Sequence, residues 1–363
     1  MLGIEDGVTC GIEFETDFLS PEVFFKKAPK TLQENFSPTH DASVESDVKV
    51  SSGLYLKNSF ERLNSRRIVI GTELVSVILN SDEEEFFKHL VELTDFLSEI
   101  GEPPTSERSG IHFHISLTNP PLKVIKNILI LGAHYENLFF KLGGMGYKFR
   151  GEKNDSIYCR PITFMGPPCV YTKNGWAQIF NLYELEQAKN STDFWTKYGD
   201  SFNNAGNRYT PARYTWLNIL GLFPRGRSGK RTVEFRVFNK TLNPYYIFAA
   251  FLMSKSLVHL AISQSYLKGV LNLKENSVFN YINTEILFNE FVEKTNFPEK
   301  WKEVVYEILK NTPSINLPEY FVKSHIYERN SPSFWNDEEF LPEIILEDIR
   351  NPNFTDIHIL RGE

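Results

Sequence analysis

Two glutamates at alternate positions, Glu13 and Glu15, are the first residues whose type and spacing could do chemistry. They lie at the end of an apolar run that starts near Val8. Because side chains alternate between the two faces of a β-strand, both carboxylates would point the same way. Two ionised carboxylates on a half-buried face repel each other unless a cation lies between them. The pair is a candidate metal platform, although a strand with one solvated face would show the same pattern.

Three further stretches place ionisable side chains on one face of a predicted strand. They carry Glu73, the pair His112 and His114, and the pair Glu234 and Arg236. The positions between Glu234 and its neighbours are apolar, as period-two alternation requires for a strand between a polar and an apolar layer. Four such strands in one chain predict a sheet with one charged, functional face and one buried, apolar face.

The residue types on this predicted face suit a hard divalent cation. Carboxylates with one imidazole favour Mg²⁺ or Mn²⁺, and the histidine shifts the preference toward Mn²⁺. Arginines cannot ligate a metal, but beside metal-bound carboxylates they fit phosphate oxygens. The candidate residues for a metal on this face are Glu13, Glu15, Glu73, His112, His114 and Glu234, and the candidate phosphate contacts are Arg160, Arg213, Arg231 and Arg236.

Several alternatives to a metal and phosphate site stay open at this point. His112 and His114 could be half of a cupin-type iron site, but the carboxylate expected about four residues later is missing, and no H-E-x-x-H zinc motif is present. The histidines could also be strand residues satisfied by hydrogen bonds. Glu234 and Arg236 could form only a cross-strand ion-pair face.

The whole-chain composition is that of an ordinary globular protein, with 363 residues, 41% hydrophobic and 23% charged. A net charge of −7 argues against a general nucleic-acid binder. The three cysteines are not in zinc spacing, and no signal peptide is recognisable, so we expect a reduced, cytoplasmic protein. The longest apolar run, Tyr245–Met253, is too short to span a bilayer, so we expect no membrane partner.

The pattern along the chain predicts strands and helices in mixed order. Strands are expected over residues 7–16, over 66–79 with Gly71 as a bulge, and over 213–219, whereas residues 21–38 are expected to be irregular. Ser81–Glu84 is a capping box for a helix that ends at Gly101. The glycines in 143–146 lack the lysine of a P-loop and are expected to end a helix. The predicted helices cover about 84–100, 120–141, 174–187, 244–266 and 296–310.

Taken in order, the motifs G-I-E-F-E, H-D-A-S-V, G-T-E-L-V-S, G-I-H-F-H-I-S, Y-C-R-P and T-V-E-F-R-V-F-N resemble the amidoligase family. Its members are carboxylate–amine ligases with the glutamine synthetase fold, and the resemblance covers about residues 7–245. It implies an α+β fold with a curled antiparallel sheet, helices on its outer face, and a helical C-terminal part. We expect a catalytic domain over 1–270 and a helical and irregular extension packed on it over 271–363.

The resemblance also implies a role for each motif. Glu13 and Glu15 would bind different metals, Glu73 would add a further metal carboxylate, and His112 and Glu234 would be metal ligands. His114 and Arg236 would contact ATP phosphates. Asp41, in a D-x-S element, would face substrate and help to deprotonate the amine. Glu13, Glu234, Arg236 and Asp41 are then the expected catalytic residues, with ATP and Mg²⁺ or Mn²⁺ as cofactors.

The activity implied is ATP-dependent amide-bond formation through an acyl phosphate, on an amino acid, a peptide or a protein side chain. Two alternatives share the fold: a phosphotransferase of the guanidino-kinase kind, and a non-catalytic nucleotide-binding scaffold. The glutamine synthetase ring is not expected here, because the first catalytic strand begins near residue 7 and leaves no space for the N-terminal domain that completes the ring. The motifs do not identify the carboxylate, the amine or the oligomeric state.

Overall fold

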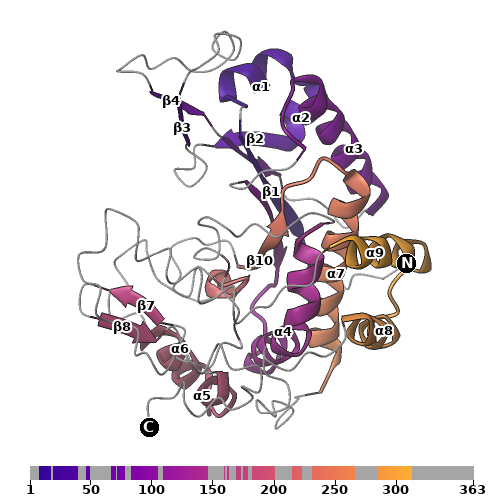
Figure 1. Cartoon of the computed structure of the whole chain (residues 1–363). Helices are drawn as coiled ribbons and strands as arrows, with labels where there is room; N and C mark the ends of the chain where they lie inside the picture. The colour runs from indigo at the N-terminus through magenta and orange to yellow at the C-terminus, as the bar shows by residue number, and fades with distance from the viewer. Residues whose placement is uncertain are drawn as a thin grey trace, which may run out of the picture.

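The computed structural model of the chain describes part of its length, shown in colour in Figure 1. The described residues are 8–17, 19–39, 46–49, 67–70, 72–77, 83–104, 109–145, 159, 162, 169–172, 175–178, 182–200, 215–222, 231–265 and 284–312. The predicted site residues Asp41, Arg160 and Arg213 lie outside these ranges, as does most of the predicted C-terminal extension.

A six-stranded antiparallel sheet forms the centre of the described structure. Its strands, in spatial order, are β2 (Phe36–Thr39), β5 (Thr72–Ser76), β1 (Cys10–Thr16), β6 (Gly110–Ser116), β10 (Thr232–Asn239) and β9 (Leu217–Asn218). The first and last strands are not paired with each other, so the sheet is open. Four further strands form two separate two-stranded antiparallel sheets. In one, β3 (Ser46–Lys49) pairs with β4 (Arg67–Ile70), and in the other β7 (Cys169–Thr172) pairs with β8 (Gly175–Gln178).

The helices of the described residues fall into groups by what they pack against. Helices α1 (Pro21–Lys27) and α2 (Lys30–Asn35) pack against strand β2, and α3 (Glu83–Glu99) packs against α2 and α7. The two longest helices are α4 (Leu122–Gly143) and α7 (Pro244–Ser263), and they pack against each other. The remaining helices are α5 (Leu182–Glu186), α6 (Ser191–Asp200), α8 (Thr284–Thr295) and α9 (Glu299–Asn311), with a 3₁₀ turn at Leu220–Leu222.

The apolar face of the main sheet is buried under α4 and α7 (Figure 1). Phe113 of β6 meets Phe251 of α7 with ring centroids 5.8 Å apart, and Phe235 of β10 meets Phe139 of α4 at 5.9 Å. Helices α8 and α9 pack in turn on α4 and α7. This leaves the opposite face of the sheet, where the polar side chains project, free of these helices.

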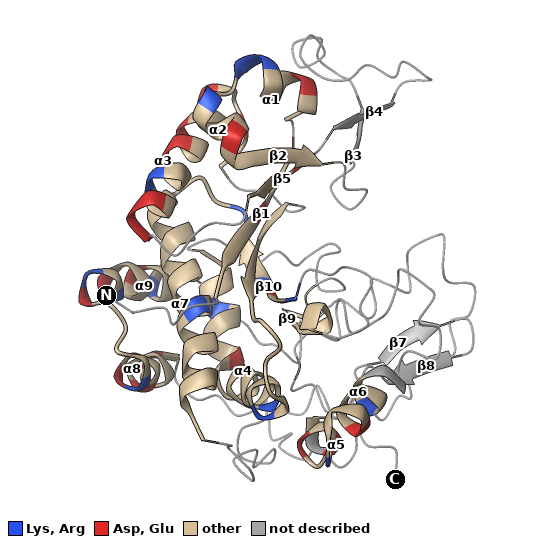
Figure 2. Ribbon diagram, turned by 180° about the vertical axis from the view of Figure 1, so that it is seen from behind, with Lys and Arg blue, Asp and Glu red and all other residues tan. Residues whose placement is uncertain are grey.

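Helix α7 is almost without charged residues, as Figure 2 shows, with Lys255 as an exception. By length and composition this 20-residue helix is apolar enough to cross a membrane, which the shorter run Tyr245–Met253 did not indicate; the expectation of no membrane partner stays a prediction. However, 78% of its most apolar window is buried inside the protein. A core helix passes the same test, and the contacts of α7 with the sheet and with α4 account for its composition.

The glycine cluster at the end of α4 stops the helix, as the sequence predicts. A Cβ atom added at Gly143 would lie 2.2 Å from the carbonyl oxygen of Val237, so only glycine allows α4 to approach strand β10 this closely. The helix end therefore fixes the strand that carries Glu234 and Arg236.

The prediction that residues 21–38 are irregular is wrong, because this segment contains α1, α2 and most of β2. The signal was present in the sequence: Ser20 caps α1 by accepting a hydrogen bond from the Val23 amide, and Pro21 occupies the first turn. Each helix has at most seven residues, too few for a helical period to stand out.

Three other predicted elements differ from the structure. The single strand over 66–79 is instead two strands, β4 and β5, which belong to different sheets. The predicted helix over 174–187 begins as strand β8, and only α5 is helical. The strand predicted over 213–219 is reduced to the two residues of β9. Alternation was visible in 213–219, but the pairing partners of β4, β5, β8 and β9 came from the rest of the fold.

The predicted α+β class, the antiparallel sheet and the strands around Glu13, His112 and Glu234 are confirmed. The helices ending at Gly101 and in the 143–146 cluster are confirmed as well. The likeness to the glutamine synthetase fold and the division into domains at residue 270 stay predictions.

Candidate metal centre

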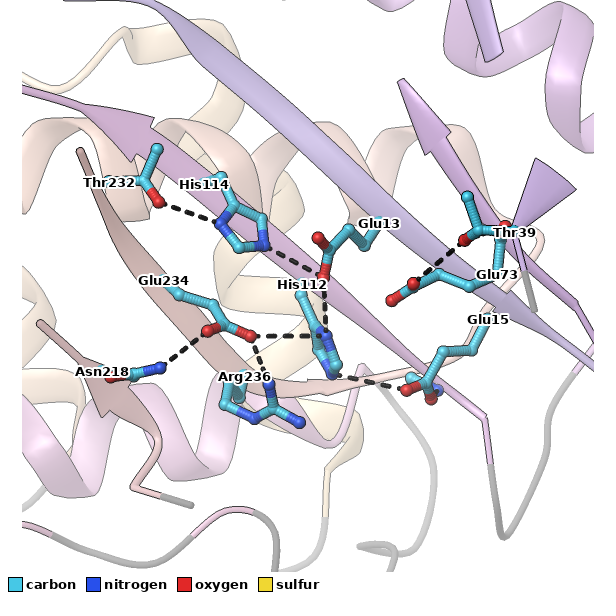
Figure 3. A network of polar contacts seen from close by, with 11 residues as sticks. Glu13, Glu15, Thr39, Glu73, His112, His114, Asn218, Thr232, Glu234 and Arg236 are labelled. Atoms are coloured by element: carbon cyan, nitrogen blue, oxygen red, sulfur yellow. Dashed lines mark hydrogen bonds and ion pairs between the residues drawn. The ribbon is translucent and has the colours of Figure 1, made fainter. Parts of the chain in front are cut away.

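Strand register gathers the predicted ligands on one face of the sheet. Within the antiparallel pairs Glu13 lies opposite His112, Glu15 lies opposite Glu73, and Glu234 lies opposite His114. Residues directly opposite each other share a face, so ligands from β1, β5, β6 and β10 project together. We call the set the polar-face cluster: Glu13, Glu15, Glu73, His112, His114, Glu234 and Arg236. Figure 3 shows these side chains turned toward one another.

Glu13 is at the centre of the polar-face cluster. Its Oε2 atom lies 3.0 Å from His114 Nε2 and 3.5 Å from His112 Nδ1. Burial opposes ionisation of this carboxyl, but the two imidazoles outweigh burial and hold the pKa of Glu13 well below its ordinary range. Glu13 is therefore an ionised carboxylate at neutral pH, available as a ligand.

Glu15 and Glu73 form the second part of the cluster. His112 Nε2 lies 3.7 Å from Glu15 Oε1, and the Gly110 amide donates a hydrogen bond to Glu15 Oε2. Glu73 is half-buried and accepts a hydrogen bond of 3.3 Å from the Thr39 hydroxyl. His112 therefore lies between the Glu13 carboxylate and the Glu15 carboxylate.

Glu234 is the third anchor of the cluster. Its Oε1 atom contacts Arg236 and lies 3.7 Å from His112 Nδ1, while its Oε2 atom accepts a 2.8 Å hydrogen bond from Asn218. Burial alone would raise the pKa of Glu234, but the Arg236 charge prevails and lowers it to about 2. In return the Glu234 carboxylate raises the pKa of Arg236 against the effect of burial.

The charges of the polar-face cluster are not balanced by its own residues. Four carboxylates face one guanidinium, and Glu13, Glu15, His112 and Glu234 are each at most 9% exposed. Buried charge of one sign is costly unless an opposite charge accompanies it. Two groups of residues each offer ligand atoms that all lie within 4.8 Å of one another. One group is Glu13, His114 and Glu234, and the other is Glu13, Glu73 and His112.

The histidine nitrogens of the cluster fit a cation. His112 Nδ1 and His114 Nε2 are buried, and within the described part of the chain neither makes a hydrogen bond of normal geometry, despite the short approach to Glu13. The other nitrogen of His114 lies 3.2 Å from the Thr232 hydroxyl, which holds the ring in place. Metal-bound imidazoles are commonly held this way through their second nitrogen.

The remaining predicted site residues are placed as follows. Arg231 precedes β10 with φ of 49°, and its side chain is exposed; among the described residues it makes no recorded ion pair with the cluster. Asp41, Arg160 and Arg213 lie outside the described residues, so their roles stay predictions.

Sequence reasoning missed three residues that touch the cluster: Asn218, Thr232 and Thr39. Asn218 holds Glu234, Thr232 holds His114, and Thr39 holds Glu73. Asn218 carried a signal, since it is the polar position in the apolar stretch Trp216–Ile219. Its strand register, which aims it at Glu234, is visible only in the folded sheet.

The fold and the site together define a mixed α+β protein with a candidate divalent-cation centre on the polar face of an open antiparallel sheet. Over residues 7–258 the chain matches a protein family described as "Putative amidoligase enzyme". The chain therefore belongs to this family, which suggests a ligase. The match includes every member of the polar-face cluster and ends within α7. No curated protein matches the chain.

Proposed function

We propose that this protein is an ATP-dependent and divalent-cation-dependent carboxylate–amine ligase that forms an amide bond. The observation that carries the proposal is the strand register, which brings carboxylates and imidazoles from β1, β5, β6 and β10 together on one buried face. The family assignment, with its ligase description, supports the same conclusion. The substrates are an amino acid, a peptide or a protein side chain on the carboxylate side, and an amine on the other.

The cations would be held by Glu13, Glu15, Glu73, His112 and Glu234. The two ligand sets described above contain all of these except Glu15, and one of the sets adds His114. Oxygen ligands with one imidazole in each set suit Mg²⁺ and Mn²⁺. When bound, such cations neutralise charge between phosphate groups and orient the reacting oxygens. Without them, the negative charge of the cluster would repel a nucleotide triphosphate.

Arg236 is the first candidate for contacting the phosphates of ATP. Its guanidinium already lies at the polar face in contact with Glu234, and a planar fork of donors matches phosphate oxygens. His114 is the second candidate phosphate contact, followed by Arg160, Arg213 and Arg231. Arginines in comparable positions of phosphoryl-transfer enzymes contribute about 10³-fold or more to the rate.

The proposed reaction has two steps, and Arg236 would stabilise the charge on the phosphoryl group that is transferred in the first. First, a substrate carboxylate oxygen attacks the γ-phosphorus of ATP, the bond to the β-phosphate oxygen breaks, and ADP leaves. The resulting acyl phosphate has phosphate as its leaving group. Second, a neutral amine attacks the carbonyl carbon, the carbon–oxygen bond to phosphate breaks, and a proton passes from the amine to a base, for which Asp41 is the candidate. The products are an amide, ADP and phosphate.

Calorimetric titration with ATP, with and without Mg²⁺, tests the nucleotide site. We expect cation-dependent ATP binding by the wild type and its loss in Glu13→Ala and Glu234→Ala. The matched control is Glu303→Ala, which removes an exposed glutamate on α9. ATP binding by a folded wild type that does not depend on a divalent cation would contradict the proposal.

An assay with hydroxylamine distinguishes a ligase from a phosphotransferase that has a similar cation and nucleotide site. Hydroxylamine replaces the amine and converts an acyl phosphate into a hydroxamate, which is detected by its ferric complex. Screening carboxylates with ATP, Mg²⁺ and hydroxylamine should give a hydroxamate, ADP and phosphate for at least one substrate. Phosphate transfer to a guanidino compound without any hydroxamate would instead indicate a phosphotransferase.

A further inference from the structure

Asn218 is a buried polar residue at the edge of the sheet, directly opposite Glu234. Its Nδ2 atom donates a 2.8 Å hydrogen bond to Glu234 Oε2, and its Oδ1 atom accepts a 3.0 Å hydrogen bond from the Leu220 amide. Because donor and acceptor are both used, the amide has one preferred orientation. Asn218 therefore presents an N–H group to one chosen oxygen of Glu234.

The strand that carries Asn218 is itself anchored to the helical layer. Trp216 Nε1 donates a 2.7 Å hydrogen bond to Glu136 Oε2 of α4, and the carbonyl of Trp216 accepts a 2.8 Å hydrogen bond from the Arg236 amide. Glu136 also accepts a hydrogen bond of 2.6 Å from the Ile162 amide. A strand of two residues would have little stability alone, so these contacts fix where Asn218 stands.

The contact with Asn218 gives the two oxygens of the Glu234 carboxylate different partners. Oε2 is turned to Asn218, and Oε1 faces His112 and Arg236 at the polar-face cluster. Without the Asn218 donor, the carboxylate could rotate and pair with Arg236 through both oxygens, a geometry that arginine favours. Such a pair would withdraw Oε1 from the cation and the guanidinium from phosphate.

We propose that Asn218 is a positioning residue that directs Glu234 Oε1 into the cation site, an inference that rests on the proposed function. It acts through its hydrogen bond to Glu234. Groups that orient a metal ligand commonly change metal affinity by about 10- to 100-fold when they are removed.

Mn²⁺ binding by calorimetry tests the inference in the full-length protein. Asn218→Leu keeps a similar volume without the donor and should bind Mn²⁺ about 10- to 100-fold more weakly than the wild type. Asn218→Gln restores a donor and should recover part of the affinity. Asn127→Leu is the matched control: this buried asparagine of α4 donates to the carbonyls of Ala261 and Gln264, which are not members of the polar-face cluster, and the variant should keep wild-type Mn²⁺ affinity while losing stability.

Crystal structures of the wild type and Asn218→Leu separate this inference from the proposed function. We expect the Glu234 carboxylate to turn toward Arg236 in the variant; a carboxylate in its wild-type position would overturn the inference. Wild-type affinity for Mn²⁺ in Asn218→Leu would also overturn it. A wild type that binds no Mn²⁺ contradicts the proposed function, and the crystal comparison still decides the role of Asn218. If Asn218→Leu does not fold, Asn218→Ala serves for both measurements.

Discussion

Two charged clusters of this protein both involve strands β1 and β10 or the residues that follow them. They differ in whether a side chain of the protein supplies the cation that the carboxylates contact. The polar-face cluster gathers four carboxylates around one guanidinium. The second, which we call the lysine cluster, consists of Lys240, Asp17 and Glu102 beyond the ends of β10, β1 and α3. Lys240 is fully buried, lies 2.7 Å from Asp17 Oδ2, and contacts Glu102, which also accepts a hydrogen bond from the Asp17 amide.

The difference between the clusters shows how function can be recognised without a ligand. In the lysine cluster the cation that the carboxylates need is part of the chain, and hydrogen bonds surround it. In the polar-face cluster four carboxylates share one guanidinium, and two buried histidine nitrogens make no hydrogen bond of normal geometry within the described residues. We therefore expect the lysine cluster to stabilise the fold, and we propose that the polar-face cluster binds a cation from solution.

The largest expected effect comes from removing the cation of the lysine cluster. Lys240→Met removes the cation that both Asp17 and Glu102 contact and should lower the free energy of unfolding by about 3–5 kcal/mol. Urea unfolding measures the change. The control Lys30→Met breaks an exposed pair with Glu34 on α2 and should cost about 0.3–0.5 kcal/mol. A comparable loss in both variants would show that the lysine cluster is not a buried ion pair.

The second expected effect concerns the cation that we propose for the polar-face cluster. At a Mn²⁺ concentration 100 times Kd, the wild type should gain about 2.7 kcal/mol of stability, and His112→Ala should gain much less. Thermal unfolding with and without Mn²⁺ measures the gain. His89→Ala, which removes an imidazole paired with Glu85 on the surface of α3, should respond to Mn²⁺ as the wild type does. An undiminished gain in His112→Ala would contradict the ligand assignment.

The third effect tests a carboxylate of the lysine cluster. Glu102→Gln removes a charge that faces Lys240 and should lower the free energy of unfolding by about 1.5–3 kcal/mol, the range for hydrogen bonds to charged groups. Mn²⁺ affinity should be unchanged, because Glu102 is not a member of the polar-face cluster. Denaturant unfolding and calorimetry measure the two quantities, and a stability equal to that of the wild type would contradict the comparison.

The smallest effect has the opposite sign. Glu73→Gln removes one of two like charges that lie directly opposite each other on β5 and β1, and should raise cation-free stability by about 0.2–1 kcal/mol. The same variant should bind Mn²⁺ more weakly. Glu34→Gln on α2 provides an exposed control. Destabilisation by Glu73→Gln in cation-free buffer would show that groups of the protein already balance the carboxylates of the polar-face cluster, as they do in the lysine cluster.

Much of the candidate site follows from local alternation. The pairs Glu13 and Glu15, His112 and His114, and Glu234 and Arg236 share faces because side chains alternate along each strand, and the apolar residues between them predict the opposite face. The α3 stop at Gly101 follows in the same way from local chemistry, since glycine readily adopts its φ of 80°. The short helices α1 and α2 escaped prediction because they contain too few turns to show a period.

Which residue types share a strand face, and so the kind of chemistry the protein can support, can be predicted from the amino-acid sequence. The folded sheet adds the strand order and register that place Glu13 opposite His112 and Glu234 opposite His114. It also decided the irregularity between Phe235 and Phe238 in β10, the separation of β4 from β5, and the contact of Asn218 with Glu234. The physical reason is that alternation is a property of one strand, whereas pairing depends on packing among residues distant in the chain.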